Sequence, residues 1–322
     1  MNLTFIAKIT AVVNFQSMEN RFYSFNEYLR GKFKERVHRI NIDAGFNCPN
    51  LDGSLSSEGC LYCNNKGFSL YSGRNISVEK QIEDSTAFYN KKMGVKKFIA
   101  YFQAFTNTHA PVDVLDKQYS IIRKYPQIVG LSISTRPDCV DGQKLDLIAG
   151  FTKDYLVWVE YGLQTTDNAI LQKINRGHTY EDFLKALKDT RERDISAGVH
   201  MLLGLPGHDR ELIRQDAVRL SGLDIQGVKF HVLHILKETA FEAEYRAGKI
   251  QLFTQDEYVD AVCDFIERLP KNVVILRLVS SALSDYLVAP DWLRDKSAVI
   301  KKIKDELEKR ETFQGIYAPH SL

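Results

Sequence analysis

The sequence has few cysteines and no long hydrophobic run. Its 322 residues include 5 cysteines, 8 prolines and 2 tryptophans. The odd number of cysteines, in a chain without secretory features, argues against a disulfide framework. No apolar stretch approaches the roughly 18 to 20 residues that a membrane span needs. We therefore expect a cytoplasmic protein with reduced thiols and no membrane partner.

Charge of one sign is not in excess either. The formal net charge is only +2, from 43 basic and 41 acidic residues. Binding to nucleic acid would therefore depend on a local basic patch and not on the field of the whole molecule. With 44% hydrophobic and 26% charged residues, the chain has the composition of a globular enzyme with a large core.

Three of the five cysteines lie within sixteen positions. Cys48 is followed by eleven residues and then by Cys60 and Cys63, which have Cys-x-x-Cys spacing. Thiolates suit iron-sulfur clusters, zinc and copper(I). The eleven residues are rich in glycine and serine, so Cys48 can fold back toward the pair. Three ligands leave a metal position open for substrate, whereas a closed structural site uses four.

The strings around these cysteines resemble the radical S-adenosylmethionine superfamily. Residues 43–53 read DAGFNCPNLDG and residues 59–64 read GCLYCN. Both strings are similar to those of a bacterial family close to the branch of the elongator catalytic subunit. Three residues usually separate the first two cysteines in the superfamily, and the eleven found here are a departure that this branch shares.

The resemblance implies the cofactors and the reaction. A [4Fe-4S] cluster would be held by Cys48, Cys60 and Cys63, with Tyr62 beside the last cysteine, and its fourth iron would bind S-adenosylmethionine. Reductive cleavage of this cosubstrate would release a 5'-deoxyadenosyl radical, with an electron donor such as flavodoxin or ferredoxin as partner. The organic chemistry belongs to the cofactor, and the protein sets orientation and water exclusion.

Two other interpretations of the cysteines remain open. A histidine such as His38 or His109 would complete a structural zinc site. Alternatively, a non-catalytic iron-sulfur or zinc protein would bind RNA or a partner enzyme through its basic amino-terminal segment. The remaining thiols, Cys139 and Cys263, are too isolated for a second cluster and are expected to pack as small apolar side chains.

The order of predicted elements is that of a parallel α/β sheet. Apolar segments alternate with helical patterns, and we predict strands at residues 37–44, 97–105, 128–134, 155–161, 198–203 and 227–236. Six successive units indicate helical crossovers between parallel strands. The resemblance favours an open three-quarter barrel over a doubly wound sheet.

The chain is divided into three parts by the same pattern. Residues 1–20 are expected to form a leader outside the fold, residues 21–244 the barrel, and residues 245–322 a carboxyl-terminal α/β extension. The extension has a capping box at its first helix, a further strand at residues 273–279 and a lysine-rich last helix.

Polar residues follow the predicted strands, at the end where parallel α/β barrels place their chemistry. The resemblance implies that they contact S-adenosylmethionine, and an ordinary structural salt bridge is the alternative for each of them. They are Gln103, Thr106 and Asn107 after the second strand, Arg136 after the third, Glu160 and Gln164 on the fourth, Arg176 beyond it, and Gly204 after the fifth.

Particular roles are expected for some of these residues. Arg136 would bind a carboxylate or phosphate in its planar fork. Arg176 would balance the carboxylate of the cosubstrate. On the sixth strand, His231 and His234 are three positions apart and are expected to face opposite sides. The family's RLTGD string reads RLVSS at residues 277–281.

A basic and aromatic segment precedes the first strand. It contains Arg30, Lys32, Lys34, Arg36 and Arg39 together with Tyr23, Phe25 and Tyr28, and the last helix adds Lys301, Lys302 and Lys304. The elongator-like resemblance suggests a transfer RNA substrate modified at a wobble-uridine side chain. Lysines and arginines would contact phosphates and aromatic rings would stack on a base. A solvated amphipathic face, and a small metabolite as substrate, are the alternatives.

The cluster prediction is tested by metal content and product. Anaerobic reconstitution should give about four irons per chain, and reduction in the presence of S-adenosylmethionine should release 5'-deoxyadenosine. Alanine at Cys48, Cys60 and Cys63 should abolish both, whereas Cys263→Ala should change neither. Zinc in place of iron, or iron without the cleavage product, would contradict the prediction.

Overall fold

Seven parallel strands form one curled sheet in the computed structural model, which describes residues 21–64, 76–280 and 282–318. The predicted leader lies outside these residues. The strands run in the order β1 (Val37–Ile42), β2 (Lys97–Phe102), β3 (Ile128–Thr135), β4 (Leu156–Gln164), β5 (Ser196–Leu203), β6 (Gly227–Val232) and β8 (Val274–Arg277). The partial parallel barrel is thereby confirmed.

The seventh strand comes from the segment predicted as an extension. β8 pairs parallel with β6, with Val228 opposite Ile275 and Lys229 opposite Arg277. The sheet therefore has one strand more than the six expected from the repeating pattern. The domain boundary at residue 244 remains a prediction.

The predicted sixth strand, residues 227–236, is two strands in the structure. β6 ends at Val232, and the short β7 (Ile235–Leu236) pairs antiparallel with β9 (Leu287–Ala289) in a separate sheet. The change of direction between β6 and β7 alters where the side chains of this segment point.

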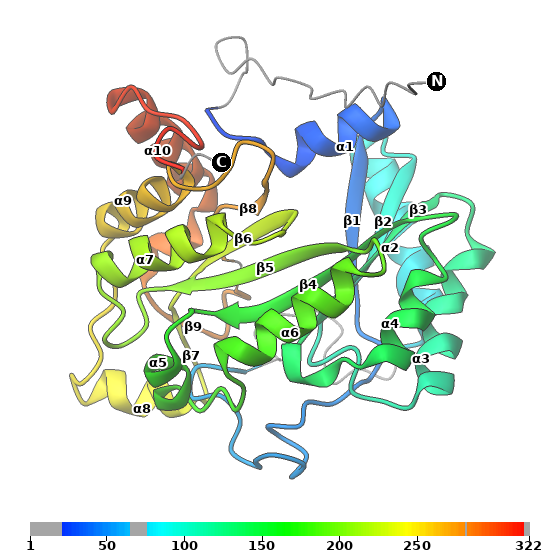
Figure 1. Ribbon diagram of the computed structural model, residues 1–322, viewed down its shortest axis with the longest axis horizontal. Coiled ribbons are helices and arrows are strands. Elements are labelled where there is room, and N and C mark those ends of the chain that lie inside the picture. Colours follow the sequence, from blue (N-terminus) through cyan, green and yellow to red (C-terminus); the bar gives the residue numbers. More distant parts are fainter. Residues whose placement is uncertain (1–20, 65–75, 281, 319–322) are drawn as a thin grey trace, which may run out of the picture.

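The helices mostly connect the strands and cover the outer face of the sheet, and the first of them precedes β1 and lies at one end of the barrel (Figure 1). They are α1 (Phe25–Phe33), α2 (Val78–Met93), α3 (Val112–Tyr119), α4 (Gly142–Ala149), α5 (Asn168–Lys173), α6 (Tyr180–Arg191), α7 (Arg210–Ser221), α8 (Ala240–Arg246), α9 (Gln255–Ile266) and α10 (Lys296–Lys309). The predicted capping box begins α9, where Thr254 and Glu257 exchange hydrogen bonds. None of the described helices has the length and hydrophobicity to cross a membrane.

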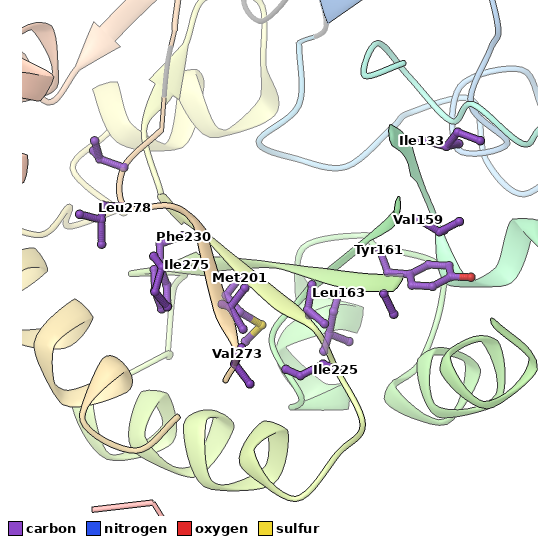
Figure 2. Packing of buried hydrophobic residues seen from close by; sticks show 14 of the residues in the cluster. Ile133, Val159, Tyr161, Leu163, Met201, Ile225, Phe230, Val273, Ile275 and Leu278 are labelled. Carbon is purple, nitrogen blue, oxygen red and sulfur yellow. The ribbon is translucent and has the colours of Figure 1, made fainter. Parts of the chain in front are cut away.

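The main hydrophobic core lies between the sheet and these helices. Side chains alternate along each strand, so every second residue points outward. Figure 2 shows the outward residues Ile133, Val159, Met201, Phe230 and Ile275 from successive strands. The other face of the same strands is thereby left for the barrel interior.

The amino-terminal end of the barrel is closed by apolar side chains and by α1. Ile99, Trp158 and Leu276 form a buried layer with Leu29 of α1. At Gly227, an added Cβ atom would lie 2.9 Å from both Trp158 and Leu276, so the glycine makes room for this layer. We call these residues the barrel floor.

The aromatic residues before the first strand belong to this floor. The rings of Phe25 and Tyr28 meet the Trp158 ring edge-on, with centroids 6.0 Å and 5.7 Å away. The cysteine loop follows the other end of β1, about 20 Å away for a strand of six residues (Figure 1). The expectation that Tyr23, Phe25 and Tyr28 stack on a base at the barrel mouth is therefore wrong.

The floor predicts a large cost for truncating Leu29, which is 2% exposed. Leu29→Ala should lower the free energy of unfolding by about 2 to 5 kcal/mol, because it leaves a cavity between α1 and the sheet. The matched control is Val114→Ala on α3, where the side chain is 39% exposed. Urea unfolding curves measure both, and equal losses would show that α1 does not close the barrel.

Candidate active site

A cavity of about 250 Å³ lies at the carboxyl ends of the strands. It is lined by nine of the twelve residues predicted from the sequence: Cys48, Cys60, Tyr62, Cys63, Gln103, Thr106, Arg136, Gln164 and Arg176. The structure thus brings together side chains that follow β1, β2, β3 and β4. The remaining three, Asn107, Glu160 and Gly204, are not among the lining residues.

The cysteine loop is held against the segment that follows α5. Asn50, two residues after the first cysteine, donates from Nδ2 to the carbonyl of Asn175 at 2.6 Å and lies 3.5 Å from Cys60 Sγ. In return, Asn175 Nδ2 donates to the carbonyl of Gly59 at 2.7 Å. These contacts dock the segment after Cys48 on the segment that follows α5.

Arg176 places a buried positive charge beside the cysteines. Its guanidinium donates to Cys60 Sγ at 3.5 Å and to the carbonyl of Gly162 at 2.7 Å. Burial alone would lower the pKa of Arg176, but neighbouring Tyr62, Cys60 and Cys48 raise it. The side chain therefore stays cationic and offsets the charge of thiolate ligands.

The thiol of Cys63 resists ionisation without a metal. Burial, followed by repulsion from Cys60 and Cys48, raises the pKa of Cys63 to about 12. Metal binding removes this proton, and the affinity of such a site is coupled to that deprotonation. Three soft donors around one cavity, with a cation beside them, fit a three-cysteine cluster with one open position.

The histidines of the zinc alternative have other partners. His38 packs on Tyr89, with ring centroids 4.0 Å apart, and His109 Nε2 lies 2.7 Å from Asp52 Oδ2. Among the described residues, no group of three or more histidine, cysteine or acidic side chains is placed to hold a single metal ion.

The fork of Arg136 is already occupied. Its Nε and one terminal nitrogen donate to the two carboxylate oxygens of Asp138, at 2.9 Å and 2.7 Å, and the other donates to the carbonyl of Arg176 at 2.7 Å. The expected binding of a ligand carboxylate or phosphate in this fork is therefore replaced by an internal pair. The two members of this pair are only two residues apart in the sequence.

Asn107 and Gly204 hold the chain and do not face the cavity. Asn107 is fully buried and its Nδ2 donates to the carbonyls of Ala104 and Ser134, at 3.0 Å and 2.9 Å. Gly204 has a φ of +83°, and an added Cβ atom would lie 3.1 Å from the Phe253 ring. The glycine is needed for this turn and this approach.

Glu160 is fully buried below the cavity and binds several strands together. One carboxylate oxygen accepts from Ser132 at 2.6 Å and pairs with Arg39 at 3.0 Å; the other pairs with His200 at 2.8 Å and Lys229 at 3.0 Å. Burial would raise the pKa of Glu160, but Arg39, Lys229 and His200 outweigh it and hold it well below its usual range. Glu160 is thus a structural ion-pair centre.

This network includes residues that the sequence did not single out. Lys229 hydrogen-bonds Tyr101, and the Tyr101 ring lies 4.3 Å from Lys229 Nζ and 4.7 Å from the Arg39 guanidinium carbon. The sequence predicts Arg39 as part of a basic surface segment, but in the structure its side chain lies inside the barrel beside Glu160. The alternation of side chains along each strand could have identified these residues in the sequence. His200, Lys229 and His231 occupy inward positions on strands that are otherwise apolar.

The two histidines near the end of β6 both line the cavity. The expectation that they face opposite sides is wrong, because β6 ends at Val232 and the chain turns before His234. His234 Nδ1 lies 2.8 Å from the carbonyl of Val232 in that turn. His231 keeps the inward direction of Lys229, two residues before it.

The remaining thiols are buried away from the cavity lining. Cys139 follows Asp138, and burial raises its pKa to about 12. Cys263 lies on α9, with Sγ 3.7 Å from the carbonyl of Ile303. Both pack as small apolar side chains, as expected.

The buried His200 predicts a loss of stability in acid. Burial and Lys229, against the pull of Glu160, lower the pKa of His200 to about 3. The unfolded chain binds a proton near pH 6.5 that the folded chain refuses until about pH 3, so stability falls as the pH drops through this window. His200→Gln keeps an N–H donor for Glu160 but cannot take up this proton. Between pH 7 and pH 5 its free energy of unfolding should therefore fall by roughly 2 kcal/mol less than that of the parent. Urea unfolding at both values measures the difference, and parallel losses would refute it.

Comparison with known proteins relates the whole chain to one family. The model of the radical SAM superfamily matches residues 57–219, and that of the Radical_SAM C-terminal domain matches residues 225–309. The chain is 35% identical over 302 residues to the protein YtqA of Bacillus subtilis, covering 94% of each. It is 26% identical over 155 residues to the tRNA uridine(34) acetyltransferase of Methanocaldococcus jannaschii, covering 47% of this chain and 28% of that protein.

A solved structure shows the same fold. The archaeal Elp3 of Methanocaldococcus infernus, with residues 1–46 deleted, superposes with a TM-score of 0.64 at 18% identity, covering 86% of this chain and 64% of that chain. The superfamily matches extend over most of the barrel and the segment after it. This chain therefore belongs to the radical S-adenosylmethionine superfamily, whose cofactors are a [4Fe-4S] cluster and S-adenosylmethionine.

Proposed function

We propose that this radical S-adenosylmethionine enzyme modifies a uridine side chain at the wobble position of transfer RNA. The similarity to the tRNA uridine(34) acetyltransferase carries the choice of substrate. The matched segment includes 47% of this chain and 28% of that protein, and the fold of Elp3 covers 86% of this chain. The acetyl transfer named for that relative is not carried over.

The cavity supports radical chemistry at the barrel mouth. Cys48, Cys60 and Cys63 would hold the [4Fe-4S] cluster, with the cosubstrate beside it. When bound, this pair supplies a 5'-deoxyadenosyl radical that removes a hydrogen atom from an unactivated carbon.

The chain's own residues orient the reactants and exclude water. Arg176 keeps a positive charge against Cys60. Gln103 and Gln164 present amide groups to the same cavity from β2 and β4, and Thr106 adds a hydroxyl. The apolar floor closes the other end of the barrel, so reactants enter and leave at the cysteine end.

The proposed transfer RNA would use two separate regions of the surface. Arg30, Lys32 and Arg36 are exposed near α1, at the end of β1 opposite the cysteine loop. Phosphates bound there would belong to nucleotides distant from the base that enters the cavity, and they would contribute salt-sensitive affinity. Of the lysines on α10, Lys301 pairs with Asp305 and Lys302 with Asp256, which weakens their support for a phosphate site.

The proposal is tested by mass spectrometry of bulk transfer RNA nucleosides from a deletion strain. We expect one modified uridine to disappear and its precursor to accumulate. The parent gene and Cys263→Ala should restore the profile, whereas alanine at Cys48, Cys60 and Cys63 should not. An unchanged uridine profile in the deletion strain would reject transfer RNA and leave a small metabolite as the substrate of the radical chemistry.

A further inference from the structure

The cavity has more positive charge than its surroundings neutralise. Four of its lining residues carry a formal positive charge, Arg136, Arg176, Lys229 and Arg277, and none of its lining residues is an aspartate or glutamate. A buried charge without a partner is costly, so each of these cations should have one.

Three of the four cations have identifiable partners. Arg136 is paired with Asp138 at 2.7 Å, and Lys229 with Glu160 at 3.0 Å. Arg176 lies against Cys60 Sγ and so faces the thiolate ligands. Within the described part of the chain, Glu160 is the only carboxylate that contacts Lys229 or Arg39, and it pairs with Arg39 at 3.0 Å.

Arg277 is the cation left over. Among the residues that the structure describes, its side chain makes no hydrogen bond or ion pair. It ends β8 and is the register partner of Lys229 on β6, which in turn is the partner of His200 on β5. Burial lowers the pKa of Arg277, and the neighbouring Tyr101 raises it by a smaller amount. The side chain is partly exposed and lines the cavity.

A second polar group near Arg277 also lacks a partner. His231 Nε2 is buried and has no hydrogen-bond partner in the described part of the chain. His231 lines the same cavity, two residues beyond Lys229 on the same strand. An arginine fork and an imidazole N–H are a donor set for an anion.

We propose that Arg277, with His231, binds an anionic group of the substrate, a carboxylate or a phosphate, inside the barrel. The inference rests on the proposed function, because it assumes that the substrate enters this cavity. The site is separate from the expected position of the cosubstrate, because its residues come from β6 and β8, whereas the cysteines follow β1 and Arg176 follows β4. The bound anion would supply the negative charge that no carboxylate of the described residues provides to Arg277.

The proposal is tested on anaerobically reconstituted protein saturated with S-adenosylmethionine. Its melting temperature is measured in orthophosphate, in acetate and in chloride at matched ionic strength. We expect saturable stabilisation by orthophosphate or acetate relative to chloride, and the effective anion identifies phosphate or carboxylate as the recognised group. Arg277→Gln should weaken the apparent affinity by roughly 30-fold or more, because it removes the charged partner.

Matched variants separate binding from a structural role. Arg277→Lys should retain part of the effect, and Lys153→Gln, at an exposed site with no proposed binding role, should retain all of it. Without added anion, Arg277→Met should melt no lower than the parent, because it removes an unpaired buried charge.

Three results would overturn the proposal. They are equal anion effects in the parent and Arg277→Gln, an anion effect that disappears once S-adenosylmethionine is bound, and no advantage of either anion over chloride. Since these measurements need no transfer RNA, they remain informative if the nucleoside profile of the deletion strain is unchanged.

Discussion

A single buried carboxylate organises the interior of this barrel. Glu160 on β4 accepts or pairs with Ser132 from β3, Arg39 from β1, and His200 and Lys229 from β5 and β6. In an environment of low dielectric constant, each of these polar groups would be costly alone, and Glu160 gives each of them a partner, although Arg39 Nε and one of its terminal nitrogens have no hydrogen-bond partner among the described residues. The network therefore fixes which side chains of these strands point into the barrel below the cavity.

The second constraint is the docking of the cysteine loop. Asn50 and Asn175 exchange hydrogen bonds with backbone groups of each other's segments, and Arg176 emerges from the same turn beside Cys60. Backbone hydrogen bonds inside the loop, such as those from Leu51 to Cys48 at 2.8 Å and from Gly59 to Asn50 at 2.7 Å, fold it on itself, and the contacts with Asn175 attach it to the barrel. The position of the thiols thus depends on a segment more than a hundred residues later in the chain.

The two constraints divide the interior by charge. At the cysteine end, the arginine beside the thiols is matched by the ligands themselves, and Arg136 is matched by Asp138. Deeper in, Glu160 neutralises less charge than Arg39, Lys229 and Arg277 bring. Functional sites commonly retain an excess of one charge at the expense of stability, because a bound ligand of opposite charge neutralises it.

The sequence by itself determined the three-cysteine ligand set and the alternation of strands and helices, because ligand type and side-chain period are local properties, and its resemblance to the superfamily added further residues that line the cavity. It did not determine that β8 joins the sheet, since the pairing of β8 with β6 joins segments more than forty residues apart. Nor did it distinguish the inward-facing Arg39 from the exposed Arg36, which is only three residues before it. Only the tertiary structure decided these points, because the direction of a strand residue and the charge left unpaired around it depend on every strand that packs against it.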